Sequence, residues 1–354
     1  MRVLIAPDKF AGTLSAVEAA SAAAEAWQGA GGDATQVPMS DGGPGFVPVL
    51  HAALGGTLLP VVVDDPLGRP VPAEVLLHER TAYIETAAAI GLHLLSPAER
   101  DPERASSRGA GQLIAAALRA GAERLVLGLG GSATNDGGAG MLGALGLRWD
   151  GAWQAPRALE ASALDPRLAA VQLIVASDVA APLLGPSGAS AVFGPQKGAS
   201  ASAVQRLDAA LGRWASAAGL PAGAPGAGAA GGLGAALLWL GGHLEPGARL
   251  VAGAVGLGGQ VAGADLVVTG EGRYDATSLR GKVIAEVAAS AQAEGLPCVV
   301  VAGQVAVGRR EAAAHGVDAT YSLAELGGSV EAAMQDPRRW LQEAVRRIAK
   351  DWAG

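Results

Sequence analysis

Residues 3–29, VLIAPDKFAGTLSAVEAASAAAEAWQG, hold the pattern that decides the fold. A short apolar run, Val3–Ala6, ends at a polar loop that contains Pro, Asp and Lys. Ser15 followed by Glu18 forms a capping box, which predicts the start of an Ala-rich helix that stops at Gly29. The stretch therefore predicts a buried strand, a loop and a helix, in that order.

The same order recurs along the chain. Near-continuous apolar strands that alternate with helices are typical of a parallel sheet covered on both faces, so the predicted fold class is α/β. Further buried strands are predicted at Leu125–Leu129, Leu173–Ala176, Leu266–Thr269 and Cys298–Ala302, and further helices at Gln112–Ala120 and Val283–Gln292.

One segment, Leu58–Glu85, breaks the alternation. It holds short strand patterns, a Pro-Leu-Gly turn and no helix pattern, which favours a β-meander. We therefore predict two α/β domains, the second inserted into the first. Residues 1–60 and 262–354 are expected to form a doubly wound, mostly parallel, Rossmann/flavodoxin-like domain, and residues 61–261 the inserted domain.

The composition of the 354 residues excludes several classes of protein. A formal net charge of −7 has the wrong sign for a protein that grips nucleic acid over a wide face. Hydrophobic residues make up 50% of the chain, which is too many for disorder, and the 53 Gly have no three-residue period, which excludes collagen. The single cysteine allows no internal disulfide and fits a reducing compartment.

Residues 214–244 carry no formal charge and raise the question of a membrane span. Pro221, Pro225 and many Gly interrupt them, so that no uninterrupted apolar run of span length remains. We expect a Gly-rich loop followed by a buried helix, Leu233–Leu240. The apolar run at the N-terminus is too short for a signal peptide, and we expect a cytoplasmic chain with no membrane partner.

Polar and charged residues follow the predicted strands, where doubly wound sheets bind ligands. Lysines are rare, with four in the chain, and three of them lie in Gly-rich or helix-start sequences that suit phosphate binding. Ordinary structural interpretations stay open: a solvated lysine, an Asn in a turn, an Asp as a helix cap, or an Arg–Asp ion pair. The candidates are Lys9, Asp41, Ser132, Asn135, Asp136, Asp178, Lys197, Glu271, Arg273, Asp275 and Lys282.

Standard catalytic motifs are missing or fit poorly. The sequence holds no P-loop and no G-x-S-x-G elbow, and its five histidines lack metal-ligand spacing. The stretch 128–133, GLGGSA, matches a dinucleotide fingerprint, but Asp136 would face the pyrophosphate with a like charge. Carboxylates, lysines and Gly-rich turns without His or Cys instead suit phosphoryl transfer, in which carboxylates hold Mg²⁺ and cations hold the phosphates.

At these residues the chain also resembles a known family, the bacterial glycerate kinases that carry A-P-D-x-F near the N-terminus. The resemblance spans nearly the whole chain and rests on APDKFAGTLSA (6–16), MSDGG (39–43), DPLGRPV (65–71), GLGGSATNDGGAGML (128–142), VFGPQKGA (192–199), GAGAAGGLGAAL (226–237) and GEGRYDA (270–276). It implies a two-domain α/β kinase that phosphorylates D-glycerate with ATP and Mg²⁺, usually to 2-phosphoglycerate.

The roles that we expect within this resemblance divide the candidates into three groups. Asp178 is expected to be the general base, with Arg273 and Lys282 holding the glycerate carboxylate or the transferring phosphate. Asp275 or Asp136 is expected to hold the metal. The substrate- and nucleotide-binding candidates are Lys9, Asp41, Ser132, Asn135, Lys197 and Glu271. The site is expected in a cleft between the two domains, and a homodimer is left open.

The chain departs from the family pattern at several positions, where polar residues of the family give way to less polar ones. A polar-to-apolar change in a pocket loses a hydrogen bond, so these positions predict a shifted substrate or weaker activity. The alternatives are a kinase for another hydroxy acid, a non-catalytic small-molecule sensor and, least favoured, an NAD-dependent reductase. The positions are Ala11, Pro44, Phe46, Ile90, Ala110 and Ala181.

Overall fold

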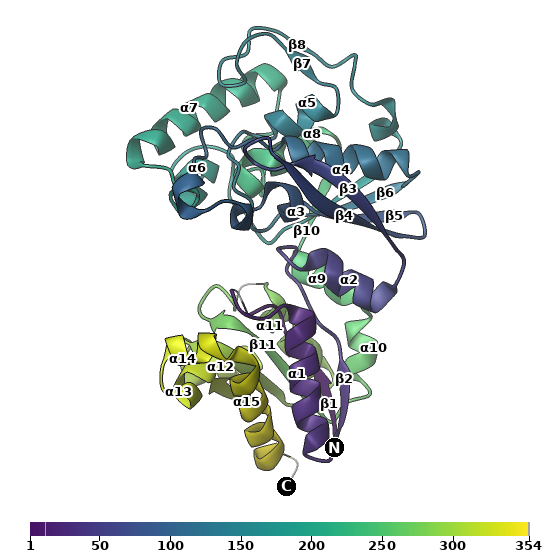
Figure 1. Cartoon of the computed structure of the whole chain (residues 1–354), viewed down its shortest axis with the longest axis vertical. Helices are drawn as coiled ribbons and strands as arrows, with labels where there is room; N and C mark the ends of the chain where they lie inside the picture. The colour runs from purple at the N-terminus through teal and green to yellow at the C-terminus, as the bar shows by residue number, and fades with distance from the viewer. Residues whose placement is uncertain (11, 280, 353–354) are drawn as a thin grey trace. The chain divides into compact units, whose positions relative to one another are not determined.

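The computed structural model describes residues 1–10, 12–279 and 281–352, and the chain divides into two compact units (Figure 1). Unit 1 comprises residues 1–41, 48–54 and 246–354, and unit 2 comprises residues 42–47 and 55–245. Each unit contains its own sheet covered by helices, which confirms the α/β class. Ala11, one of the departures from the family pattern, lies outside the described residues.

Unit 1 is built on a five-stranded sheet in which every pair of neighbours is parallel. The order places β1 and β11 side by side, with Ile5 opposite Val268, so the loop that follows β1 runs beside the later part of β11. In sheet order the strands are β13 (Ala319–Ser322), β12 (Cys298–Val305), β11 (Leu266–Tyr274), β1 (Arg2–Ile5) and β2 (Asp33–Gln36).

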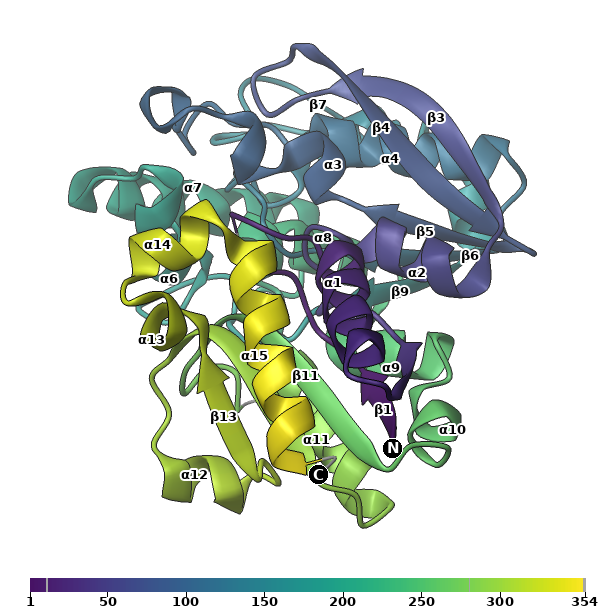
Figure 2. The same ribbon diagram turned by 60° about the horizontal axis from the view of Figure 1, so that its bottom comes forward.

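Two long helices of unit 1, α1 (Ala16–Gly29) and α15 (Pro337–Trp352), pack against each other over one face of this sheet (Figure 2). The predicted capping box is confirmed, because Ser15 accepts from the Glu18 amide and Glu18 from the Ser15 amide. The other helices are α9 (Gly247–Ala254), α10 (Leu257–Val261), α11 (Val283–Ala293), α12 (Arg309–Ala314), α13 (Leu323–Gly327) and α14 (Val330–Gln335), with α2 (Phe46–Leu54) assigned mostly to unit 1.

Unit 2 is built on a six-stranded mixed sheet. The predicted meander is confirmed: β3, β4 and β5 pair antiparallel, whereas β5, β6, β9 and β10 pair parallel. In sheet order the strands are β10 (His243–Glu245), β9 (Gln172–Ala176), β6 (Arg124–Gly128), β5 (Thr81–Glu85), β4 (Pro70–His78) and β3 (Thr57–Asp64), and β7 (Arg148–Trp149) pairs separately with β8 (Leu159–Glu160).

The helices of unit 2 bury small and branched apolar side chains against this sheet in one core. The predicted buried helix near residue 233 is present as α8. The helices are α3 (Ala87–Ile90), α4 (Arg108–Arg119), α5 (Ala139–Ala144), α6 (Ala189–Phe193), α7 (Ala201–Ala218) and α8 (Leu233–Trp239), with short 3-10 turns at Leu92–Leu94, Pro97–Glu99, Pro166–Ala169, Pro195–Lys197 and Ala229–Gly232.

The limits of the two units differ from the domain limits that the sequence predicts, near residues 60 and 261. Residues 57–60 belong with unit 2 because they begin β3, which pairs with β4 along its length. Residues 247–261 belong with unit 1 because α9 and α10 pack against α11. Across the three described ranges of the chain, none of the helices combines the length and hydrophobicity needed to span a bilayer.

Candidate active site

A cavity of about 440 Å³ in unit 1 brings together residues from five separate segments of the chain, which lie within 8–13, at 41, and within 271–282, 303–304 and 323–337. Strand β11 is longer than predicted, because its pairing with β12 continues as far as Tyr274 opposite Val305. Glu271 and Arg273 therefore lie on the strand rather than in a loop, two residues apart and on the same face. Six predicted site residues line the cavity: Lys9, Asp41, Glu271, Arg273, Asp275 and Lys282.

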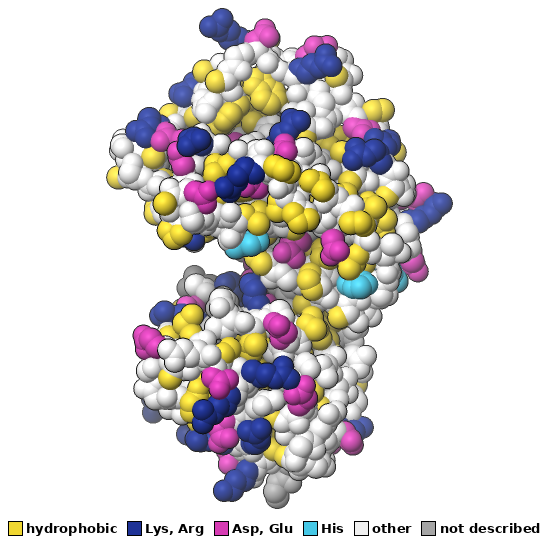
Figure 3. Space-filling view, in the orientation of Figure 1, with side chains coloured by type: hydrophobic (Ala, Val, Ile, Leu, Met, Phe, Trp, Pro, Cys, Tyr) yellow, Lys and Arg dark blue, Asp and Glu magenta, His cyan; other side chains and the backbone are white. Residues whose placement is uncertain are grey.

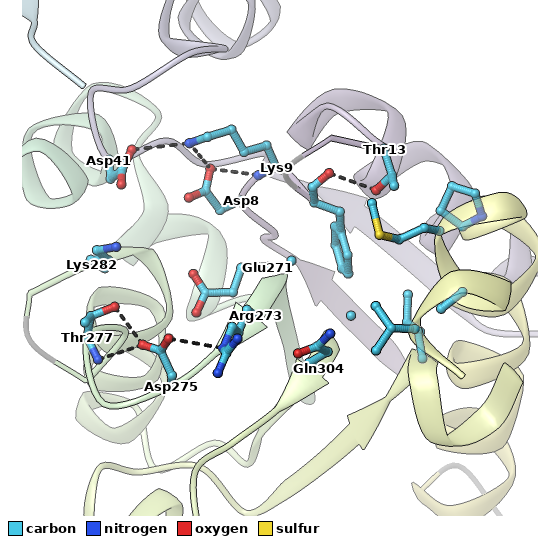
Figure 4. A pocket seen from close by; sticks show the side chains of 18 residues that line it. Asp8, Lys9, Thr13, Asp41, Glu271, Arg273, Asp275, Thr277, Lys282 and Gln304 are labelled. Carbon is cyan, nitrogen blue, oxygen red and sulfur yellow. Dashed lines mark hydrogen bonds and ion pairs between the residues drawn. The ribbon is translucent and has the colours of Figure 1, made fainter. Parts of the chain in front are cut away.

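Lys9 lies between two carboxylates at the carboxyl end of β1 (Figure 4). Its Nζ is 3.5 Å from Asp8 Oδ1 and 3.4 Å from Asp41 Oδ1. Burial disfavours the charge of Lys9, but the two carboxylates outweigh burial and raise its pKa. Burial raises the pKa of Asp8 to about 6, against the opposing effect of Lys9.

Asp8 is a cavity residue that our sequence interpretation omitted from the site. Its neighbour Lys9 is one of the four lysines of the chain, and Asp8 lies in the same strand-end loop. The amide of Asp8 donates to Gly270 O at 2.8 Å, which ties this loop to β11. The position of Asp8 directly after a buried strand was the signal that could have included it.

Glu271 is the carboxylate that β11 contributes to the cavity wall. The residue is 7% exposed, and Oε1 has no hydrogen-bond partner among the residues that the structure describes. Burial raises the pKa of Glu271 to about 7, and the nearby carboxylates of Asp8 and Asp41 act in the same direction. In Figure 4 its carboxylate lies between Asp8 and the pair formed by Arg273 and Asp275.

Cationic groups line the same cavity beside Asp275. Arg273 Nε is 3.5 Å from Asp275 Oδ2, and Asp275 Oδ1 accepts from both the amide and the hydroxyl of Thr277. These hydrogen bonds lower the pKa of Asp275. Lys282 is the N-cap residue of the 11-residue helix α11, whose N-terminal end adds a positive partial charge at the same place.

A second cavity, of about 280 Å³, lies in unit 2 and contains two further predicted residues, Ser132 and Lys197. Lys197 belongs to the 3-10 turn Pro195–Lys197 and donates to Ser132 Oγ at 3.0 Å and to Thr134 O at 2.7 Å. Burial lowers the pKa of Lys197 to about 7, and Asp136 partly opposes this effect.

Asn135 and Asp136 are buried in the loop after β6. Asp136 Oδ2 accepts from the amide and hydroxyl of Ser107 and from the amide of Gly140, and Oδ1 accepts from the amide of Gly138. Four hydrogen bonds leave this carboxylate little capacity for a metal. Asn135 Nδ2 donates to Ser190 Oγ at 2.9 Å, which fixes its side chain within the fold.

Asp178 follows β9 and is half buried, but it is not among the residues that line either of these two cavities. Three departures from the family pattern, Phe46, Ile90 and Ala110, are fully buried apolar residues. Phe46 packs edge-to-face against Tyr83, with ring centroids 6.4 Å apart. The lining of the two cavities does not include these three side chains, so their hydrophobicity serves packing.

The cavity of unit 1 has donors that suit Mg²⁺. Asp275 Oδ2 lies 3.5 Å from Arg273 Nε, and Glu271 Oε1 has no hydrogen-bond partner among the described residues. Mg²⁺ is commonly held by one or two protein carboxylates together with phosphate oxygens, so two carboxylates in the cavity wall match that pattern. No group of three or more His, Cys, Asp or Glu residues arranged for a metal is found in the described part of the chain.

Similarity to known proteins extends over the entire chain. Residues 3–353 match the model of the glycerate kinase family. A glycerate kinase of Bacillus subtilis is 42% identical over 370 residues, which cover 99% of this chain and 97% of the relative. A glycerate 2-kinase of Escherichia coli K12 is 39% identical, again over 99% of this chain and 97% of the relative.

A solved structure is similar over the same extent. The crystal structure described as that of a glycerate kinase 2 from Salmonella typhimurium LT2 superimposes with a TM-score of 0.82 at 39% sequence identity. The match covers 100% of this chain and 98% of the Salmonella chain. The resemblance noted in the sequence motifs is thereby confirmed, and the chain belongs to the glycerate kinase family.

Proposed function

We propose that this protein transfers the γ-phosphoryl group of ATP to the C2 hydroxyl of D-glycerate, forming 2-phosphoglycerate and ADP. The observation that carries the proposal is the meeting of Lys9, Glu271, Arg273 and Lys282 in one cavity of unit 1. Phosphoryl transfer depends mainly on positioning and charge neutralisation, which this set of side chains can supply. Membership of the family supports the substrates, and the name of the Escherichia coli relative supports the C2 position.

The proposed step moves one proton and one phosphoryl group. The glycerate oxygen forms a bond to the γ-phosphorus, the bond from that phosphorus to the bridging oxygen of ADP breaks, and the hydroxyl proton leaves. We assign that proton to Glu271, because its Oε1 is buried at the cavity wall with no partner among the described residues. Arg273 and Lys282 neutralise charge on the phosphoryl oxygens.

Magnesium is part of the proposal through Asp275, whose Oδ2 is the available carboxylate oxygen beside the cations. When bound, Mg²⁺ would neutralise phosphate charge and orient the triphosphate. Asp136 receives a structural role in this proposal, because its hydrogen bonds to Ser107, Gly138 and Gly140 occupy it. The charged surface fits a small-molecule enzyme, since acidic and basic side chains are interspersed on the face in Figure 3.

The position of the new phosphate is expected to be visible in the proton-coupled ³¹P spectrum of the product. A phosphate on C2 couples to one proton and gives a doublet, whereas a phosphate on C3 couples to two protons and gives a triplet. We expect a doublet after incubation with D-glycerate, ATP and Mg²⁺, and no product after chelation of Mg²⁺. A triplet would refute the C2 assignment, and absence of any phosphoglycerate under all conditions would refute the proposed function.

The Lys282→Ala variant is expected to lower kcat/KM for D-glycerate by about 10- to 100-fold. Removal of one charged hydrogen-bond donor to a phosphate costs about 1.5–3 kcal/mol, which corresponds to this range. A coupled assay of ADP release measures the effect. Lys350→Ala is the matched control, because Lys350 lies exposed on α15 and should leave kcat/KM unchanged. Full activity of Lys282→Ala would remove Lys282 from the site.

A further inference from the structure

The cavity of unit 2 contains one charged side chain in its lining, that of Lys197. The residue is 2% exposed, so its ammonium group is removed from bulk water. The wall around it is largely apolar, with Leu92, Leu129, Val179 and Phe193 among its residues. A charge in such surroundings is costly unless a counter-charge or hydrogen-bond acceptors compensate it.

The hydrogen bonds of Lys197 compensate only part of this cost. A lysine ammonium has three protons, and among the described residues those of Lys197 reach two acceptors, Ser132 Oγ and Thr134 O. Neither acceptor carries a formal charge. The acid that influences Lys197 electrostatically is Asp136, but its carboxylate is occupied by four other donors and forms no hydrogen bond with Lys197 among the described contacts.

Ser132 provides a second donor at the same place. Its Oγ accepts from Lys197, so its own proton points elsewhere, and no acceptor for that proton is found in the part of the chain that the structure describes. Ser132 is 7% exposed and lines the cavity beside Lys197. One buried ammonium proton and one buried hydroxyl proton are therefore available to a ligand that accepts hydrogen bonds.

We propose that the cavity of unit 2 is an oxyanion subsite, in which a carboxylate or phosphate group of a ligand accepts hydrogen bonds from Lys197 Nζ and Ser132 Oγ. An oxyanion supplies both the missing counter-charge and the missing acceptors. A volume of about 280 Å³ lies just below the range of about 300–1,000 Å³ usual for drug-sized ligands, so the cavity suits a compact anion or the anionic end of a larger molecule.

The choice between carboxylate and phosphate rests on the proposed function, whose substrates carry both groups. The subsite itself is measured by binding and does not require turnover. Orthophosphate, D-glycerate and ADP are the three probes, because they separate a bare phosphate, a carboxylate and a nucleotide as the source of the oxyanion.

The four lysines of the chain make a direct measurement practical. In the NMR spectrum of protein labelled with ¹³C-lysine, each of the four lysines gives its own side-chain Cε signal. The signal that is missing from the spectrum of the Lys197→Arg variant belongs to Lys197. We expect at least one probe to shift the Lys197 signal of the unmodified protein saturably. The pH midpoint of this signal, about 7 without ligand, should rise by about one unit, because an anion favours the ammonium form.

Two comparisons keep the subsite and the reaction distinguishable. The Lys350 signal is the control and should not respond, since that side chain is exposed on α15. In Ser132→Ala, the dissociation constant of the bound probe should rise by about tenfold, because one hydrogen bond to a charged group is lost. A Lys197 shift without phosphoglycerate formation would uphold the subsite and refute the reaction.

The subsite is refuted if none of the three probes moves the Lys197 signal. It is also refuted if the probes shift only the signals of Lys9 and Lys282, which belong to the cavity of unit 1. A shift that does not change the pH midpoint of Lys197 would contradict direct contact with an anion. In each of these cases Lys197 serves to hold the loop that contains Ser132 and Thr134.

Discussion

The Glu271→Gln variant is expected to lose most of its turnover, with kcat lower by about 10²- to 10⁴-fold, the range that a positioned proton acceptor contributes. Glutamine preserves the size of the side chain and its possible hydrogen bonds, but its amide cannot accept the hydroxyl proton at neutral pH. Because the cations Arg273 and Lys282 remain in place, KM for ATP should change little. Steady-state kinetics with D-glycerate and ATP separate the two parameters.

The pH profile tests the same assignment independently. The acceptor must be ionised, so kcat/KM of the unmodified enzyme should rise with pH between about 6 and 7, where burial places the pKa values of Asp8 and Glu271. These groups interact with each other and with Lys9, Asp41 and Lys282, so the rise belongs to the coupled set rather than to one residue. Glu271→Gln should remove the part of this rise near pH 7.

Asp178→Asn is the comparison that separates the two candidate bases. If Asp178 accepts the proton, as the sequence predicts, its Asn variant should show the large loss of kcat and the changed pH profile. If Glu271 accepts it, Asp178→Asn should retain the rise near pH 7. Near-normal kcat in Glu271→Gln would overturn our assignment whatever the result for Asp178.

The Asp136→Ala variant is expected to lower the free energy of unfolding by about 3–5 kcal/mol. Its carboxylate holds Ser107 to the loop after β6 and accepts four hydrogen bonds, and each buried donor that loses its acceptor costs about 1–3 kcal/mol. Urea unfolding followed by circular dichroism measures the change. Hydrogen exchange at the amides of Ser107, Gly138 and Gly140 should accelerate in the variant, since these groups lose their acceptor.

Asp150→Ala is the matched control for Asp136→Ala, because Asp150 is an exposed aspartate of the same unit. Its effect on unfolding should stay within about 0.5 kcal/mol. An Asp136→Ala variant that unfolds like the unmodified protein but needs far more Mg²⁺ for activity would contradict the structural role. That result would restore Asp136 as a metal ligand.

Local sequence patterns predict which helices and strands are present better than they predict where each one ends. The capping box at Ser15 and the meander before Glu85 depend on nearby residues, so the sequence contains them. The extension of β11 to Tyr274 depends on its pairing with β12, a partner about 30 residues away that local propensity does not report.

In the candidate site, too, local sequence does not show which distant residues come into contact. Lys9 and Lys282 could be selected as rare lysines in suggestive loops. The structural role of Asp136 depends on Ser107, 29 residues earlier in the chain, which no motif connects with it. Similarly, the family pattern predicts Phe46 and Ile90 as altered pocket residues, whereas their complete burial explains their apolar character.

The insertion of unit 2 into unit 1 has a consequence for biosynthesis. Strand β1 is synthesised before unit 2, but its partner β11 begins at Leu266, so the pairing of β1 with β11 has to wait until unit 2 has been made. At translation rates of about 5–20 residues per second, the wait between β2 and β11 is on the order of 10–50 s. The intervening nascent segment can acquire its native topology during this time, whereas β1 has only β2 as a sheet partner until β11 is made.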